Sequence, residues 1–260
     1  MANLLGKVAL ITGASSGIGS GTALRFAALG CKLSVTGRNS QNLDKVIQEC
    51  VNAGAKSSDI HKVVGDVSKE EDLHKILQST IDYFGKLDIL VNNAGILQPG
   101  SVEMASLESY DAMMNVNVRS LFVLTKLAIP YLKQTRGNII NVSSIAGTRS
   151  FPGIAAYAMS KAAVDQLTRC TALELAPDGV RVNAVNPGVI ITEVHKRGGM
   201  SEADYAKFLE HCKETHALGR PGTVDEVAQA IAFFASDATA SFITGVTMPI
   251  DGGRGVMCPR

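Results

Sequence analysis

Short hydrophobic runs alternate with longer amphipathic segments along most of the chain. The runs are rich in valine and isoleucine and show little polar alternation, which is typical of strands buried on both faces of a parallel sheet. They predict strands at 7–12, 32–36, 61–67, 86–93, 137–144, 179–187 and 245–251. The segments between them have helical periodicity and predict helices at 17–29, 40–53, 69–84, about 107–133, 157–176 and 224–235.

This alternation predicts an α/β fold, because each parallel crossover needs a helix and is right-handed. We expect a single-domain Rossmann fold: a doubly wound, seven-stranded parallel sheet with helices on both faces. The 260 residues, 46% of them hydrophobic, suit one large core, and no linker-like stretch divides them. Ligands of such sheets bind at the carboxyl ends of the strands. Candidate functional residues are therefore sought at that edge.

Charge and cysteine content narrow the function classes. Lys+Arg 25 against Asp+Glu 24 leaves a net charge of +1, which offers no footprint for nucleic acid or an anionic membrane. The five cysteines are widely spaced without a CxxC pair, so neither a disulfide framework nor a zinc site is indicated.

His195, His211 and His216 lack compact ligand spacing, and no metal is expected. Without a signal-like N-terminus or an apolar run of about 18 residues, we expect a cytoplasmic protein with no membrane span.

The sequence TGASSGIG, residues 12–19, joins the first predicted strand to the first helix. Gly13, Gly17 and Gly19 permit a tight turn and close backbone approach, while the N–H groups at the start of the helix attract a pyrophosphate. A purely structural turn is the alternative. The position inside a βαβ unit favours a dinucleotide.

The end of the second predicted strand refines the cofactor. Dinucleotide sites for NAD carry an acidic residue there, which accepts hydrogen bonds from the ribose hydroxyls. Here residues 34–42 read SVTGRNSQN, with Arg38 and no carboxylate before Asp44. A guanidinium can bind a 2′-phosphate, so NADP(H) is favoured over NAD(H). The alternative is a solvated arginine in a turn.

Tyr157 and Lys161 lie four residues apart, on one face of a predicted helix. A free phenol titrates near 10 and is a poor acid or base at neutral pH, but a nearby ammonium favours the phenolate and lowers its pKa. The pair is therefore a candidate for acid–base chemistry. A chance pair on a solvated helix is the alternative.

Five motifs together resemble the classical short-chain dehydrogenase/reductase family: TGASSGIG, NNAG (92–95), NVSS (141–144), YAMSK (157–161) and NPG (186–188). The match runs nearly end to end. The resemblance implies that Tyr157 is the proton donor and acceptor, and that Lys161 assists it while binding ribose hydroxyls. Ser144 matches the serine that hydrogen-bonds the substrate oxygen, and its neighbour Ser143 is expected to pack.

Asn117 matches the family's asparagine that supports a proton relay to the lysine, with Asn115 as the competitor. The resemblance implies a larger set of cofactor-binding residues. For Asn93 and its neighbour Asn92, a purely structural role is the alternative. This set is Gly13, Ser15, Ser16, Gly17, Ile18, Gly19, Arg38, Asp66, Val67, Asn93, Ala94, Gly95, Tyr157, Lys161, Pro187, Gly188, Val189 and Thr192.

These features predict an NADP(H)-dependent oxidoreductase that interconverts a ketone or aldehyde and its alcohol, with Tyr157 as general acid/base. A 3-oxoacyl-(acyl-carrier-protein) reductase is one alternative, with the basic residues 195–197 as a possible carrier contact. A catalytically silent dinucleotide-binding sensor or scaffold is another.

The substrate would lie between residues 146–156 and a lid at about 189–222 within the single domain 1–260. Val189, Ile190, Ile191, Val194, Met200 and Phe208 would line an apolar pocket or, alternatively, pack the lid. The resemblance also implies a homotetramer, with the helices at 107–133 and 157–176 in one interface and the tail 255–260 as a possible contact to a neighbour.

Overall fold

The computed structural model describes residues 2–257 and contains one seven-stranded parallel sheet. The strand order is β3-β2-β1-β4-β5-β6-β7, so the order reverses between β1 and β4. The strands are β1 (Val8–Ile11), β2 (Lys32–Gly37), β3 (Ile60–Val64), β4 (Ile89–Asn92), β5 (Asn138–Val142), β6 (Arg181–Pro187) and β7 (Thr247–Ile250). The predicted fold class and all seven strands are confirmed, with ends that differ by up to a few residues.

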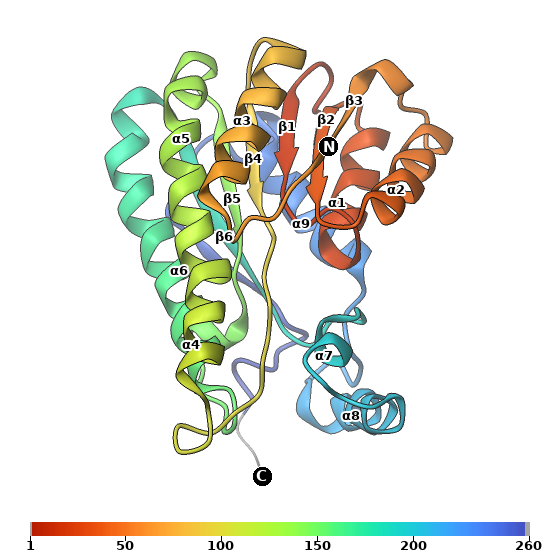
Figure 1. The fold of residues 1–260 in the computed structure, drawn as a ribbon, viewed down its shortest axis with the longest axis vertical. Coiled ribbons are helices and arrows are strands. Elements are labelled where there is room, and N and C mark those ends of the chain that lie inside the picture. The colour runs from red at the N-terminus through yellow and green to blue at the C-terminus, as the bar shows by residue number, and fades with distance from the viewer. Residues whose placement is uncertain (1, 258–260) are drawn as a thin grey trace.

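Helices cover both faces of the sheet (Figure 1). One layer contains α1, α2 and α9, and the other contains α3, α5 and α6. The longer helices are α1 (Gly17–Ala28), α2 (Ser40–Asn52), α3 (Glu70–Phe84), α4 (Leu107–Met114), α5 (Ser120–Thr135), α6 (Ala155–Leu175), α8 (Glu202–Thr215) and α9 (Val224–Ala235). Two short ones complete the set, α7 (Val194–Arg197) and α10 (Asp237–Ala240).

The two apolar cores explain why the sequence shows unbroken hydrophobic runs. Every residue of β1 is buried, and its side chains alternate between the layers: Ile11 packs toward α1 and α9, and Leu10 toward α3 and α5. A strand covered on both sides must be apolar at both parities. The sheet is thereby held as a rigid platform whose carboxyl ends remain uncovered by either layer.

Two features were not foreseen from the hydrophobic pattern. The helix expected at 107–133 contains a π-helical turn, Asn115–Arg119, between α4 and α5. The segment 189–222, expected as a lid, folds into α7 and α8, which lie below the carboxyl ends of the strands in Figure 1. Because both helices are largely polar, their stability depends on tertiary contacts more than on an apolar face.

The continuous helical stretch Leu107–Thr135 is, among the described residues, the one that is long and apolar enough to cross a membrane. It packs on α3 and α6, and 39% of its most apolar part is buried. Cys31, Cys50, Cys170 and Cys212 are free thiols, whereas Cys258 and the last part of the tail lie outside the described residues.

Candidate active site

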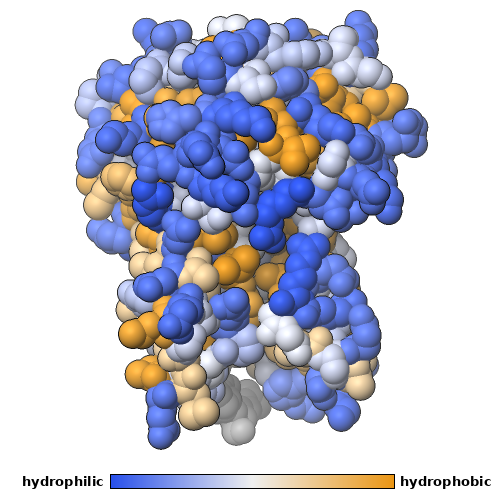
Figure 2. Space-filling model, viewed as in Figure 1, coloured by the Kyte–Doolittle hydropathy of each residue, from blue (hydrophilic) through white to orange (hydrophobic). Residues whose placement is uncertain are grey.

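A cavity of about 810 Å³ opens at the carboxyl ends of the strands. Its walls come from the β1–α1 loop, the ends of β2, β4, β5 and β6, the start of α6, and the segment containing α7 and α8. In Figure 2 the front of the molecule is hollowed at this level, and hydrophobic residues show within the hollow. Every site residue expected from the sequence lines this cavity except Gly19 and Asn117, which lie directly behind its wall.

The glycine loop is packed too closely for side chains. Gly13 has a left-handed φ of 64°, and a Cβ there would lie 2.8 Å from Nδ2 of Asn93. A Cβ on Gly19 would lie 2.3 Å from the Gly13 carbonyl oxygen. Nδ2 of Asn93 donates to the Thr12 carbonyl at 2.8 Å and so holds the loop. Asn93 therefore has a structural contact as well as a place in the cavity wall, and Gly19 acts through packing.

The first turn of α1 faces the cavity with its N–H groups available. Ser16 precedes the helix with extended backbone, and its side chain makes no capping hydrogen bond. Its Oγ instead accepts a hydrogen bond at 2.9 Å from Nη2 of Arg197, in the lid. Free N–H groups, the helix dipole and a guanidinium together fit a dinucleotide pyrophosphate. Sequence reasoning considered Arg197 only as a carrier-protein contact and missed its place beside the glycine loop, because Ser16 is far away along the chain.

Directly after β2, Arg38 is exposed and lines the cavity. Asp44, the nearest following carboxylate in the sequence, is bound to Lys62 at 2.6 Å. Burial raises the pKa of Asp66, but hydrogen bonds to Ser68 and the positive charges nearby, including Arg38, outweigh burial and leave that pKa below its usual value. Asp66 is therefore an anionic acceptor in the cavity wall, next to Val67.

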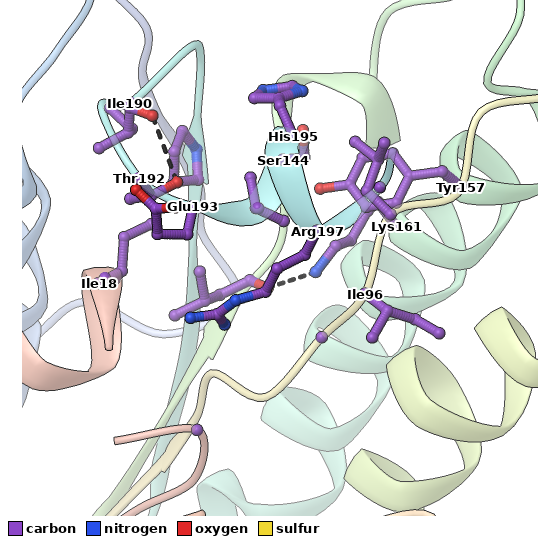
Figure 3. Close-up of a pocket in the computed structure, with 18 of the residues that line it drawn as sticks. Ile18, Ile96, Ser144, Tyr157, Lys161, Ile190, Thr192, Glu193, His195 and Arg197 are labelled. Atoms are coloured by element: carbon purple, nitrogen blue, oxygen red, sulfur yellow. Dashed lines mark hydrogen bonds between the residues drawn. The ribbon is translucent and has the colours of Figure 1, made fainter. Parts of the chain in front are cut away.

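Tyr157 and Lys161 extend from α6 toward Ser144, which follows β5 (Figure 3). Nζ of Lys161 donates to the Val142 carbonyl at 2.9 Å and lies 5.7 Å from the centre of the Tyr157 ring. Oγ of Ser144 accepts the Ala146 N–H at 3.1 Å. This bond uses the serine oxygen as an acceptor and leaves its O–H group as a donor. A phenol, a hydroxyl and an ammonium thus meet at one place.

Burial decides the proton affinities of this group. It raises the pKa of Tyr157, opposed by the Ser144 hydroxyl. This corrects the sequence argument, which expected Lys161 to lower that pKa. Burial also lowers the pKa of Lys161 to about 8, while the carboxylate of Asp165 acts in the opposite direction. Both shifts arise because a low-dielectric surrounding disfavours the charged form.

Asn117 lies in the π-helical turn and is almost completely buried. Its Oδ1 accepts the Ile96 N–H at 2.8 Å, and its Nδ2 donates to the Ile96 carbonyl at 2.9 Å and to Ser160. It thereby fixes the loop after β4 beside Lys161. Asn115, the competitor, instead donates to the Ser68 carbonyl on the other side of the turn.

Asn92 and Ser143 both make contacts inside the protein, as the structural interpretations of the sequence proposed. Nδ2 of Asn92 donates to Thr125 and to Asn141, inside the protein. Ser143 donates to the Lys161 backbone carbonyl at 3.1 Å, so it fixes α6 on the sheet. The packing expected for Ser143 is confirmed.

The segment after β6 closes a third side of the cavity with Pro187, Gly188, Val189 and Thr192. The Val189 N–H donates to Nε2 of His216, a buried histidine whose lowered pKa keeps that nitrogen an acceptor. Sequence reasoning expected no metal at His216 and assigned this histidine no particular contact. Its observed contact is to the backbone of the cavity wall.

The lid contributes an apolar wall and separates its basic residues. Of the apolar candidates, all but Ile191 line the cavity. His195 packs on Phe208 with ring centres 4.7 Å apart, and Lys196 pairs with Glu193 and Glu202. Residues 195–197 therefore point in different directions and form no basic surface patch. Within residues 2–257, no three His, Cys, Asp or Glu side chains converge as a metal site.

Comparison with known proteins places this arrangement in a family. A family model described as "Enoyl-(Acyl carrier protein) reductase" matches residues 13–254. The 3-oxoacyl-[acyl-carrier-protein] reductase of Thermotoga maritima is 39% identical and aligns with 96% of this chain and 98% of its own. Dehydrogenase/reductase SDR family member 4 of Caenorhabditis elegans is 38% identical, over 95% of each chain.

Solved structures agree. A short-chain dehydrogenase/reductase of unknown function from Caenorhabditis elegans, crystallised with cofactor, superimposes with a TM-score of 0.94 at 34% identity, covering 98% of this chain and 97% of that one. The 3-ketoacyl-(acyl-carrier-protein) reductase of Brucella melitensis, complexed with NADH, gives 0.87 at 37% identity, covering 97% and 100%.

These matches span nearly the whole chain, and they agree with the glycine loop and with the Tyr157–Lys161 pair at the expected edge of the sheet. They make the protein an oxidoreductase that uses a nicotinamide dinucleotide. The chain belongs to the classical short-chain dehydrogenase/reductase family.

Proposed function

We propose that this protein is an NADP(H)-dependent oxidoreductase that interconverts a ketone or aldehyde and the corresponding alcohol, with Tyr157 as general acid/base. One observation carries the proposal: Tyr157, Ser144 and Lys161 meet in the same cavity as an uncapped helix N-terminus and a glycine loop. Such a cavity holds a dinucleotide at one end and an oxygen-bearing substrate at the other.

The dinucleotide, when bound, supplies or accepts the hydride. In the direction of reduction, Tyr157 donates its proton to the substrate oxygen. Burial raises the pKa of this phenol, so it holds that proton at neutral pH. Ser144, whose Oγ already accepts the Ala146 N–H, donates its own proton to the same oxygen and stabilises the negative charge that develops there.

Lys161 has three N–H donors and spends one on the Val142 carbonyl. The other two are available for ribose hydroxyls and for a water that leads toward Asn117. Asn117 holds the loop after β4 close to Lys161. A Cβ on Gly95, in this loop, would lie 3.3 Å from Oδ1 of Asn117 and 3.6 Å from Nζ of the lysine. We assign Asn117 a positioning role in that relay.

The preference for NADP(H) rests on Arg38. Its guanidinium stands exposed at the end of β2, where an NAD-binding site would carry a carboxylate. A 2′-phosphate would bring its charge to this arginine. The Brucella relative was crystallised with NADH, so the family fold by itself does not select the cofactor, and Arg38 is the residue to test.

A 3-oxoacyl-(acyl-carrier-protein) reductase remains the second candidate, because relatives at 38–39% identity carry that name. The basic residues 195–197 no longer support it, since Lys196 is paired and Arg197 faces the glycine loop. A silent sensor is disfavoured by the complete set Ser144, Tyr157 and Lys161 in one cavity.

The test is a steady-state NADPH oxidation assay on the purified protein with diketones, 3-oxoacyl thioesters, isoprenoid aldehydes and keto-steroids, with NADH run in parallel. We expect turnover that depends on Tyr157 and is faster with NADPH. Tight NADPH binding without turnover of any of these carbonyl compounds would favour the sensor instead.

We also propose a homotetramer in the cytoplasm. The outer face of α4, α5 and α6 exposes Phe122 and Met159, which are 52% and 54% accessible in the single chain. Exposed apolar side chains on neighbouring helices suit a subunit interface. Light scattering with size-exclusion chromatography measures the mass, and a monomer would contradict the assembly.

A further inference from the structure

Arg254 follows β7 and lines the active-site cavity. In the sequence it is far from the glycine loop, which would hold the dinucleotide phosphates. Its guanidinium carbon lies 4.9 Å from the centre of the Phe151 ring, in the segment between Ser144 and Tyr157. The same cavity is also lined by the apolar side chains of Ile154, Met200 and Phe208. A half-buried arginine in such a wall requires an explanation.

No carboxylate within residues 2–257 forms a direct ion pair with this guanidinium. Asp251 is the nearest candidate along the chain, but its two oxygens accept the N–H groups of Gly253 at 3.0 Å and Gly255 at 2.6 Å. These bonds direct the carboxylate into its own turn, and it acts on Arg254 only at longer range, without a direct ion pair. Burial is the main cause that lowers the pKa of Arg254; the charge of Arg149 acts in the same direction, and Cys212 and Asp251 oppose it.

The backbone around Arg254 is held firmly in place. Arg149 donates to the Arg254 carbonyl and, at 2.9 Å, to that of Met257. The Arg149 guanidinium therefore donates to backbone carbonyls, whereas the five N–H donors of Arg254 remain available for a ligand. The two arginines differ in role: one anchors the C-terminal segment, and the other presents charge to the cavity.

We propose that Arg254 binds a carboxylate of the substrate, so that the substrate is an oxo acid, or the matching hydroxy acid, with an apolar body. A guanidinium pairs with a carboxylate through two parallel hydrogen bonds, and one cation balances one negative charge. The apolar wall of Phe151, Ile154 and Phe208 would enclose the rest of the molecule. This inference rests on the proposed function and names the substrate class for the same site.

The first experiment measures kcat/KM for a series of phenyl-substituted oxo acids, with the carboxylate two to five bonds from the ketone, each paired with its primary amide. The acid should be preferred in the best pair by about tenfold or more, the range of a charge-assisted pair. Arg254→Met should lower kcat/KM for that acid by about ten- to a hundredfold and leave the amide within about threefold. Arg254→Lys should retain part of the preference.

Arg169→Met is the matched control, because this exposed arginine of α6 bonds only to Gln166 among the described residues and lies outside the cavity. It removes the same charge and should behave like wild type. Equal use of acid and amide by the wild-type protein, or an equal loss for both in Arg254→Met, would overturn the proposal. Thermal unfolding checks that each variant is folded.

A binding measurement separates this inference from the proposed function. Calorimetry with 3-phenylpropanoate and its amide, on protein saturated with NADPH, should show tighter binding of the carboxylate by about tenfold, and Arg254→Met should abolish the difference. Such binding without reduction of any carbonyl would overturn the proposed function and support the inference. Reduction of neutral ketones without carboxylate preference would do the reverse.

Discussion

The charge of Lys161 sets a pH limit on the proposed reaction. Burial lowers the pKa of this lysine from 10.5 to about 8, which corresponds to about 3 kcal/mol against the charged form. The ammonium is therefore present below pH 8, and the neutral amine prevails above it. Because burial raises the pKa of Tyr157, the phenol keeps its proton over the same range. A fall in rate near pH 8 would report the lysine.

Removing the charge of Asp165 should change the pH at which the rate falls. It lies one helical turn after Lys161, is 1% exposed, and both its oxygens accept from Nδ2 of Asn186 at 3.0 Å. Two charges one helical turn apart, at about 6 Å, interact by about 3 kcal/mol at an effective dielectric constant of about 20. Asp165→Asn removes the carboxylate that raises the lysine pKa, so the fall should move to lower pH by about one unit or more.

The assay is kcat/KM for reduction of a good carbonyl substrate from pH 6 to 10, which reports ionisations of the free enzyme. For the wild-type protein, kcat/KM should be constant up to about pH 8 and then decline. For Lys161→Arg, whose side chain stays charged, kcat/KM should not decline over this range. NADPH affinity at each pH is the control. A level wild-type profile up to pH 10, or an unchanged decline in Lys161→Arg, would refute the reasoning.

Three further changes test other parts of the site. Tyr157→Phe should lower kcat by about 10²- to 10⁴-fold or more while NADPH affinity, measured by fluorescence, changes little, because only the proton donor is lost; retained turnover would contradict the mechanism. Arg38→Asp should raise KM for NADPH by about a hundredfold and leave KM for NADH nearly constant, since only the 2′-phosphate is repelled; parallel changes would argue against its role. Gly19→Ala should lower the free energy of unfolding by about 3 kcal/mol, because its Cβ would lie 2.3 Å from the Gly13 oxygen; a denaturation curve like that of wild type would contradict this packing.

The local chemistry of this protein could be predicted from the sequence. The apolar runs identified all seven strands, most clearly the central ones, because a residue buried on either face must be hydrophobic. The spacing of Tyr157 and Lys161 placed both on one side of α6, since helical geometry is fixed by sequence distance alone. The glycine pattern located the loop for the same reason: a tight turn depends on the residues within it.

What lay beyond local spacing required the tertiary structure. The Arg197–Ser16 contact, the support of Val189 by His216 and the place of Arg254 beside Phe151 join segments distant in sequence, where no periodicity links the partners. The raised pKa of Tyr157 also escaped sequence reasoning. Neighbouring residues reveal which charges are near, but the desolvation of a phenol depends on how the whole fold encloses it, and only the packed structure decides that.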